Sequence, residues 1–287
     1  MQIIESASGL LSETQRYRRA GKTIGLVPTM GYLHQGHLSL VEYLRPKVDI
    51  LIASIFVNPT QFGPSEDLDS YPRDATGDLN KLRAARVDIA FTPELADMYP
   101  ERGEVTVTPP TLATRLCGAS RPTHFAGVCT VVLKLFGLSN CTDAIFGEKD
   151  YQQLQVLRAM NRQFFLGINI HGGPIVREPT GLAMSSRNAY LSTRERELAL
   201  CLSRALREAQ QLFEESRKRK EHLSVERLRT HVLSGLPLSE VGVALDYLDI
   251  VDPTTLDPAE TLNADTRVIL ALHVGKTRLI DNAALID

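Results

Sequence analysis

The stretch GLVPTMGYLHQGHLSLVEYL, residues 25–44, decides how the chain is expected to fold. The apolar residues 23–27 predict a short buried strand, and Pro28, which has no N–H group, is expected to end its pairing. A glycine-containing turn, residues 29–31, precedes a helical pattern. Strand, loop and helix start together predict the ligand-binding edge of an open parallel sheet, where unpaired N–H groups and the helix dipole favour phosphate.

Two histidines stand three residues apart in His34-Gln35-Gly36-His37. On a helix they would share one face, and the glycine would let a ligand approach the backbone closely. Taken alone, such a pair is more often a surface feature or a satisfied core pair than a site, and no third ligand for zinc stands nearby. In this context the pattern resembles the His-Ile-Gly-His signature of the nucleotidylyl-transferring Rossmann-like superfamily, whose two histidines contact ATP phosphates.

Composition limits the classes of function. The chain has 287 residues, 43% of them hydrophobic and 23% charged, with a formal net charge of -2, so two globular domains fit and no nucleic-acid or membrane partner is expected. Without a signal-like start or an apolar run of about 18 residues, the protein is expected to be cytoplasmic. The four cysteines form no C-x-x-C pair and are interpreted as reduced, mostly buried thiols.

Two later segments repeat the strand-then-polar-loop pattern. An apolar run, residues 48–57, predicts a strand covered on both faces and ends at Asn58, so Asn58 and Gln61 are expected at the same sheet edge. Turn chemistry also explains Asn58, but it leaves Gln61 unexplained. A short strand, residues 144–146, leads into Gly-Glu-Lys-Asp at 147–150, which places a cation and a carboxylate at a strand-to-helix turn, although a helix-initiating Asp beside a solvated Lys accounts for them too.

The alternation of strands and helices predicts an α/β protein: a Rossmann-like, doubly wound parallel sheet in residues 1–175. Residues 176–287 are expected to form a smaller α+β domain, with helices at 193–219 and 225–233 and strands at 244–251, 267–274 and 278–281. Two helix starts are assigned caps, Ser12 for a helix that ends at Gly21 and Thr123 for a buried apolar helix. An acidic loop containing Asp67, Asp69 and Asp74 is left without a metal assignment.

Five blocks, taken in order, resemble the pantothenate synthetase (pantoate–β-alanine ligase) family. The resemblance implies ATP-dependent condensation of pantoate with β-alanine through an enzyme-bound pantoyl adenylate, with release of AMP and pyrophosphate. It also implies Mg²⁺, a Rossmann-like nucleotide domain, a small C-terminal lid domain and a homodimer. The blocks are PTMG with HQGH (28–37), FVNPTQF (56–62), RPTHFAG (121–127), FGEKDYQQ (146–153) and AMSSRN (183–188).

The resemblance also implies roles for single residues. Arg187 supplies the charge in a loop that lacks the lysines of the superfamily's Lys-Met-Ser-Lys-Ser motif, and no metal ligand is assigned. The implied catalytic residues are His34, His37, Lys149 and Arg187; the implied nucleotide contacts are Met30, Gly147, Asp150, Val176, Ser185 and Ser186; the implied pantoate contacts are Gln61, Gln153, Val131 and Val132.

This residue set suits the implied chemistry. Pantoate is already a carboxylate at neutral pH, so its attack on the α-phosphorus needs alignment and charge stabilisation rather than a general base. No base is assigned for the later attack by the amine of β-alanine. Two other functions stay open: a nucleotidyltransferase that attaches AMP or CMP to an alcohol phosphate, and a non-catalytic ATP-binding module.

Overall fold

The computed structural model describes residues 1–64, 66–103 and 105–286. The chain forms two compact units. Unit 1 contains Met1–Glu148 and Gln153–Pro174, and unit 2 contains Lys149–Gln152 and Ile175–Asp287. The chain therefore passes from unit 1 into unit 2 for four residues, Lys149–Gln152, and returns before it enters unit 2 again at Ile175.

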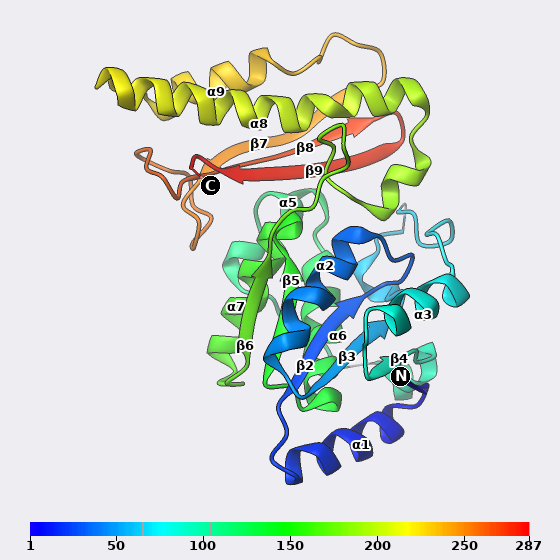
Figure 1. Ribbon diagram of the computed structural model, residues 1–287. Coiled ribbons are helices and arrows are strands. Elements are labelled where there is room, and N and C mark those ends of the chain that lie inside the picture. Colours follow the sequence, from blue (N-terminus) through cyan, green and yellow to red (C-terminus); the bar gives the residue numbers. More distant parts are fainter. Residues whose placement is uncertain (65, 104, 287) are drawn as a thin grey trace. The chain divides into compact units, whose positions relative to one another are not determined.

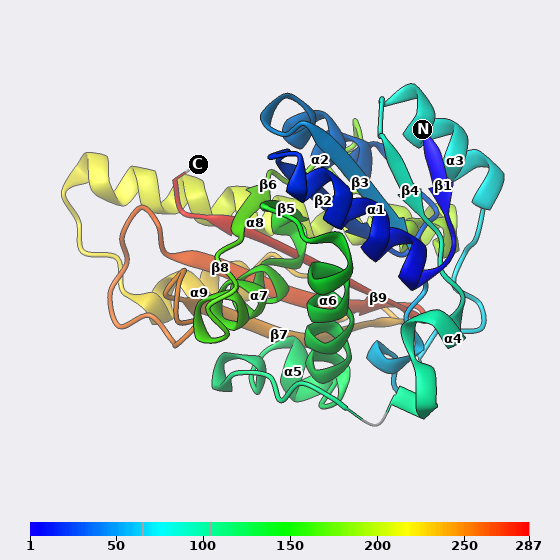
Figure 2. The same cartoon turned by 90° about the horizontal axis from the view of Figure 1, so that it is seen from below.

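Within the described residues, unit 1 is built on a six-stranded sheet in the order β1-β4-β3-β2-β5-β6, and all its strand pairs are parallel (Figure 1). Figure 2 shows β1 at the sheet edge beside β4. The predicted doubly wound parallel sheet is confirmed. The strands are β1 (Gln2–Ile4), β2 (Ile24–Thr29), β3 (Ile50–Ile55), β4 (Ile89–Phe91), β5 (Asp143–Gly147) and β6 (Asn169–Gly173).

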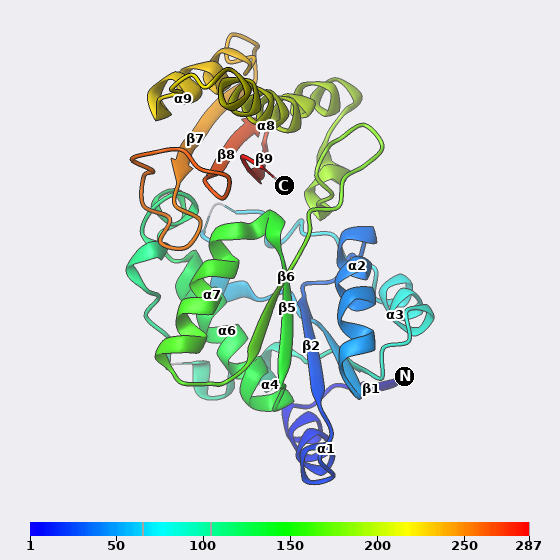
Figure 3. The same ribbon diagram turned by 60° about the vertical axis from the view of Figure 1, so that its left-hand side comes forward.

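Helices cover both faces of this sheet, with α2 and α3 on one face and α6 and α7 on the other (Figure 3). The buried apolar helix expected after Thr123 is α6, and its valines and phenylalanines are buried. The α-helices are α1 (Ala7–Arg19), α2 (Gln35–Leu44), α3 (Ala75–Ala84), α4 (Leu95–Met98), α5 (Cys117–Ser120), α6 (His124–Ser139) and α7 (Tyr151–Gln163). Short 3-10 turns are η1 (Arg45–Lys47), η2 (Pro59–Gln61), η3 (Pro100–Gly103), η4 (Thr111–Ala113) and η5 (Glu148–Asp150).

The strand order reverses between β2 and β5, because the chain runs from β2 to β3 and β4 on one side and to β5 and β6 on the other. Ligands of open parallel sheets bind outside the carboxyl ends of the strands at such a reversal. The loop after β2 carries the histidine motif, and β5 ends at Gly147. The segments singled out by sequence therefore follow two strands that are direct neighbours in the sheet.

The expectation that Pro28 ends the pairing of β2 is wrong, since Pro28 pairs with Ser54 and Thr29 with Ile55. Thr29 accepts a hydrogen bond from Phe56 of the β3 side, whereas Ile24 accepts one from Thr142 of the β5 side. Residues alternate between the two neighbours, so the missing N–H of Pro28 faces β5. The ladder with β5 reaches only Leu26, and the proline therefore costs no hydrogen bond.

Two helix caps also differ from the sequence expectation. Ser6, not Ser12, caps α1, because its extended backbone lets its side chain accept a hydrogen bond from the Gly9 N–H. Thr123 stands at the N-cap position of α6 but makes no capping hydrogen bond with its side chain. The sequence predicted both helices. It did not predict which nearby Ser or Thr caps each one, because capping depends on the backbone geometry at that residue.

Unit 2 is a three-stranded antiparallel sheet, β7-β8-β9 within the described residues, with α8 and α9 packed on one face (Figure 1). The α+β domain expected here is confirmed as a fold. Gly275, with φ of 59°, turns the chain between β8 and β9 at the expected hairpin. The elements are η6 (Ser186–Tyr190), α8 (Thr193–Arg219), α9 (Val225–Ser234), β7 (Val243–Val251), β8 (Arg267–Val274) and β9 (Thr277–Ala284).

All four cysteines are buried and free of disulfides, which confirms how they were interpreted. No helix among residues 1–64, 66–103 and 105–286 has the length and apolar character required to cross a bilayer.

Candidate active site

The two histidines of the motif do not lie on one helical face as expected. His34 is the N-cap of α2 with an extended backbone, and only His37 lies inside the helix, at its third position. The rings nevertheless stack, with centroids 4.0 Å apart and an interplanar angle of 32°. The helix start, rather than the helical repeat, brings the two imidazoles together.

Both imidazoles accept hydrogen bonds from backbone N–H groups at the start of α2. The Nδ1 of His34 accepts a hydrogen bond from the Gly36 N–H at 3.1 Å, and the Nδ1 of His37 accepts one from the His34 N–H at 3.3 Å. A neutral imidazole whose Nδ1 accepts must carry its proton on Nε2. Both rings are therefore fixed as Nε2–H donors, which is the form that an anionic phosphate oxygen requires.

A buried carboxylate holds the loop before these histidines. Asp78 of α3 is 1% exposed and accepts hydrogen bonds from the N–H groups of Tyr32 and Leu33, both at 2.7 Å. Lys81, one turn further on, donates to the Leu33 carbonyl at 2.8 Å. Gly31 and Tyr32 both have positive φ, and a Cβ on Gly31 would lie 3.0 Å from the Asp78 carboxylate. The tight loop and its anchor fix the entry to α2.

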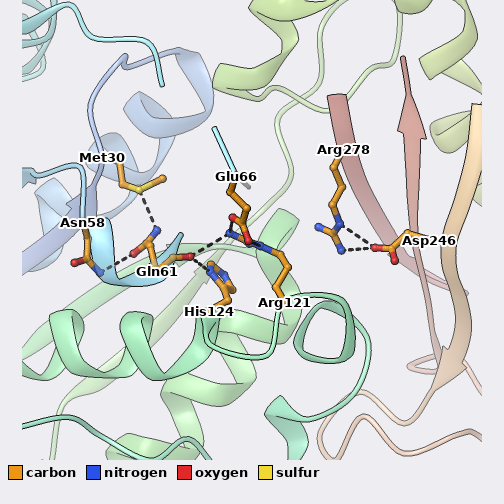
Figure 4. A network of polar contacts seen from close by, with 8 residues as sticks. All are labelled: Met30, Asn58, Gln61, Glu66, Arg121, His124, Asp246 and Arg278. Carbon is orange, nitrogen blue, oxygen red and sulfur yellow. Dashed lines mark hydrogen bonds and ion pairs between the residues drawn. The ribbon is translucent and has the colours of Figure 1, made fainter. Parts of the chain in front are cut away.

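Gln61 links the loops that follow β2 and β3 (Figure 4). Its Nε2 donates to the sulfur of Met30 at 3.0 Å, and its Oε1 accepts from the Asn58 side chain at 3.2 Å. Asn58 is 1% exposed and also accepts from the Tyr99 hydroxyl at 2.7 Å. Asn58 thus does more than form a turn, because its amide orients the side chain of Gln61.

The backbone of Gln61 is held from the opposite side by Arg121, which precedes α6, and by His124, the first residue of α6 (Figure 4). Arg121 donates to the Gln61 carbonyl at 3.2 Å, and the His124 Nδ1 lies 2.8 Å from the same oxygen. Since a carbonyl only accepts, His124 carries a proton on Nδ1. Arg121 also pairs with both carboxylate oxygens of Glu66. Burial opposes ionisation of Glu66, but Arg121 outweighs it and the pKa of Glu66 stays below its usual value.

Helix α6 packs closely against this turn because it has a glycine at the contact. A Cβ on Gly127 would lie 2.3 Å from the Thr60 carbonyl oxygen and 2.6 Å from the Gln61 nitrogen. One turn along the same helix, Val131 and Val132 are buried, at 6% and 4% exposed. The helix therefore places an apolar surface within the same part of unit 1 as the network around Gln61.

The carboxyl end of β5 contributes Gly147 and, within α7, the half-buried Gln153. A Cβ on Gly147 would meet nothing within 4 Å, so this backbone borders open space. Gly147 and Gln153 belong to unit 1 together with Met30, Gln61 and the histidines.

Unit 2 holds the other predicted site residues. Lys149 and Asp150 lie in the 3-10 turn η5, with Lys149 Nζ 3.9 Å from an Asp150 oxygen and their side chains 20% and 50% exposed. The loop from Val176 folds back on itself, because the Met184 N–H donates to the Val176 carbonyl at 2.9 Å. Ser185 then caps η6 by accepting from the Arg187 N–H at 3.3 Å, and Ser186 is buried. One continuous segment, the hairpin of residues 176–184 with η6 directly after it, thus carries Val176, Ser185, Ser186 and Arg187.

Several residues of these networks had no role predicted from sequence. Asp78 stands outside every recognised block, and no local signal points to a contact 46 residues away. Asp74, considered as part of an acidic loop, instead caps α3 by accepting from Gly77 at 2.9 Å. In the parts of the chain that the structure describes, no group of three or more His, Cys, Asp or Glu side chains is arranged to bind a metal ion.

Comparisons with known proteins found close similarity over nearly the whole chain. A family model described as "Pantoate-beta-alanine ligase" matches residues 2–284. A pantothenate synthetase of Geobacter sulfurreducens is 51% identical over 286 residues, 99% of each chain. A crystal structure of pantothenate synthetase from Thermus thermophilus superposes with a TM-score of 0.91 at 41% identity, covering 100% of both chains. A Francisella tularensis pantoate-beta-alanine ligase, complexed with Beta-gamma ATP and Beta-alanine, gives 0.80 at 34% identity, with 99% and 98% covered.

Proposed function

The chain belongs to the pantoate–β-alanine ligase family, and from this premise we propose that it forms pantothenate in two steps, through a pantoyl adenylate that stays on the enzyme. In the first step the pantoate carboxylate attacks the α-phosphorus of ATP and pyrophosphate leaves. In the second the amine of β-alanine attacks the acyl carbon and AMP leaves. The observation that carries the proposal most directly is the fixed pair of Nε2–H donors beside the strand-order reversal.

The histidines receive the phosphate chain of ATP in this proposal. Two donors with preset tautomers stabilise charge on phosphate oxygens without the cost of reorienting during the reaction. The N-terminus of α2 adds its dipole to the same place. Met30 and Gly147 border the nucleotide in unit 1, since both lie at the carboxyl ends of neighbouring strands.

Unit 2 contributes further phosphate ligands, again as a proposal. Lys149 follows the last residue of β5, Gly147, by two positions in the chain, and it supplies one cation for the triphosphate. Ser185, Ser186 and Arg187 supply hydroxyl groups and a second cation for the triphosphate, with Val176 beside the nucleotide and Asp150 on the ribose hydroxyls. Positive charge from Lys149 and Arg187 would neutralise the leaving pyrophosphate.

Pantoate is proposed to bind next to Gln61. Its hydroxyl groups and carboxylate match the amides of Gln61 and Gln153, while its two methyl groups match the apolar surface of Val131 and Val132. The network of Asn58, Arg121 and His124 supports this assignment, because it fixes both the side chain and the backbone of Gln61.

Mg²⁺ is proposed to enter with ATP. Magnesium commonly reaches such sites bound to phosphate oxygens and water with few protein ligands, so a dedicated carboxylate cluster is not required. When bound, it supplies charge neutralisation on the triphosphate. The protein's own residues bind, align and exclude water, and the amine of β-alanine is proposed to enter already deprotonated. A homodimer in the cytoplasm remains part of the proposal.

An assay of ATP consumption with pantoate and β-alanine tests this function. We expect AMP and pyrophosphate in equal amounts, and we expect no product in which the nucleotide is attached to another molecule. A product carrying AMP or CMP on an alcohol phosphate would support a nucleotidyltransferase instead. Binding of ATP without turnover on a panel of acids would support a non-catalytic module.

Replacing Gln61 by alanine should weaken pantoate binding more than ATP binding. The change leaves a buried polar group of the substrate unpaired at a cost of about 1–3 kcal/mol, which is roughly a 5- to 150-fold rise in KM for pantoate. The KM values for both substrates, measured separately at saturating co-substrate, check this. Gln163→Ala, at an exposed position near the end of α7, is the control and should change neither value. An equal loss for both substrates would contradict the assignment of Gln61.

A further inference from the structure

We propose that Asp281 and Asn282, adjacent residues on β9, are positioning residues that align both phosphate-binding segments of unit 2. One segment contains Lys149 and the other, the hairpin with η6 directly after it, carries Ser185, Ser186 and Arg187. This inference rests on the proposed function and adds to it, since neither residue is expected to touch a substrate.

Asn282 holds the backbone of Lys149. Its Nδ2 donates to the Lys149 carbonyl at 3.1 Å, and its Oδ1 accepts from Arg267 at 2.5 Å, which fixes the orientation of the amide. Arg267 also lies over the ring of Tyr151, 3.8 Å from its centroid, and the Tyr151 hydroxyl donates to the Pro253 carbonyl at 2.9 Å. These contacts hold the segment Lys149–Gln152 to the rest of unit 2, and they explain why these four residues belong to unit 2 although the residues on either side belong to unit 1.

Asp281 holds the start of the hairpin. Arg177 donates to its two carboxylate oxygens, at 2.6 and 3.0 Å, and also to the Gly181 carbonyl at 3.2 Å. Arg177 forms a bridge with Ala183, directly before the segment Met184–Arg187. A bidentate guanidinium–carboxylate pair fixes orientation as well as distance, so it holds the start of the hairpin against β9.

The two contacts lie on opposite faces of one strand. Side chains alternate along β9, and Leu279 points into the core under α8 and α9, so Asp281 shares that face and Asn282 lies on the other. Both residues are almost fully buried, at 2% and 1% exposed, and buried polar side chains are costly unless their hydrogen bonds are made. A single strand therefore holds both the Lys149 backbone and the start of the hairpin that leads to Arg187.

The test is a double-mutant cycle between Asn282→Asp and Lys149→Ala, read as kcat for AMP formation. The carboxylate of the variant still accepts from Arg267 but cannot donate to the Lys149 carbonyl. We expect Asn282→Asp alone to lower kcat about 10- to 100-fold with little change in KM, because small misplacement of an aligned charge is costly. In the Lys149→Ala background the same change should lower kcat less than about threefold, since the residue through which it acts is gone.

The second double-mutant cycle combines Asp281→Asn with Arg187→Ala, and Arg177→Lys replaces Asp281→Asn if that variant fails to fold. In the Arg187→Ala background we again expect the added change to lower kcat less than about threefold. Asn263→Ala is the matched control, because Asn263 also holds a loop of unit 2 through its side chain, at the Asp265 and Thr266 N–H groups. It should leave kcat unchanged.

Effects of Asn282→Asp that multiply fully with those of Lys149→Ala would overturn the inference, as would a fall in melting temperature with unchanged kcat per folded enzyme. Wild-type protein that forms no AMP would overturn the proposed function together with the inference. Wild-type protein that forms AMP, with independent effects in the cycle, overturns the inference alone.

Discussion

Lys149→Ala is expected to lower kcat by about 10² to 10³, with the fold intact, because the change removes a cation from charge that builds on phosphate in the transition state. The Lys149 ammonium makes only a long ion pair, 3.9 Å from an oxygen of the half-exposed Asp150, so its loss should cost the fold little. Initial rates of AMP formation at saturating ATP, pantoate and β-alanine measure the effect.

Lys276→Ala in the β8–β9 turn is the control for loss of one lysine, and it should turn over like wild type. Lys149→Arg should keep part of the activity, since the charge remains but its geometry changes. Normal turnover of a folded Lys149→Ala enzyme would mean that Lys149 is only a solvated charge. The catalytic role implied by the resemblance of the Gly-Glu-Lys-Asp segment would then be wrong.

His37→Asn is expected to lower kcat about 100-fold or more while the protein keeps its melting temperature. The asparagine Oδ1 can replace Nδ1 as acceptor for the His34 N–H, so the helix start survives, but the distal Nε2–H donor is lost. Loss of a single preorganised donor of this kind costs about 10² to 10³ in kcat.

The companion variant His37→Gln should have the opposite effect on the two contacts of this side chain. Its longer amide reaches the position of Nε2 and keeps a donor there, while the contact to the His34 N–H is lost. We expect a lower melting temperature but higher kcat than in His37→Asn. His222→Asn, at an exposed position, is the control. Equal kcat in the two His37 variants would contradict the role assigned to the Nε2–H donor.

The sequence predicted the fold well because the relevant signals are local. Continuous apolar runs marked the parallel strands, and the change at Ile175 marked where alternation ends. The wrong expectation about Pro28 depends on which neighbouring strand its backbone faces. Pro28 is harmless because its missing N–H points to β5, beyond the end of that ladder, and only the strand order reveals this.

The predicted site residues come from recognisable motifs, whereas the residues that support them carry no such signal. Blocks that contain His34, Gln61 and Lys149 are recognisable because several unusual residues stand together. Asp78 and Asn282, in contrast, are single polar residues in ordinary elements, and they matter through contacts 46 and 133 residues away. Such partners follow from tertiary packing, which no periodicity of the sequence encodes.

The measurement that tests the two-step mechanism most directly is exchange of labelled pyrophosphate into ATP. The acyl adenylate is a high-energy mixed anhydride, so its formation should reverse readily while water is excluded. We predict exchange with pantoate present and β-alanine absent, none with either ATP or pantoate omitted, and slower exchange in Lys149→Ala. Exchange that strictly requires β-alanine at saturating pyrophosphate would contradict the adenylate intermediate and favour a concerted route.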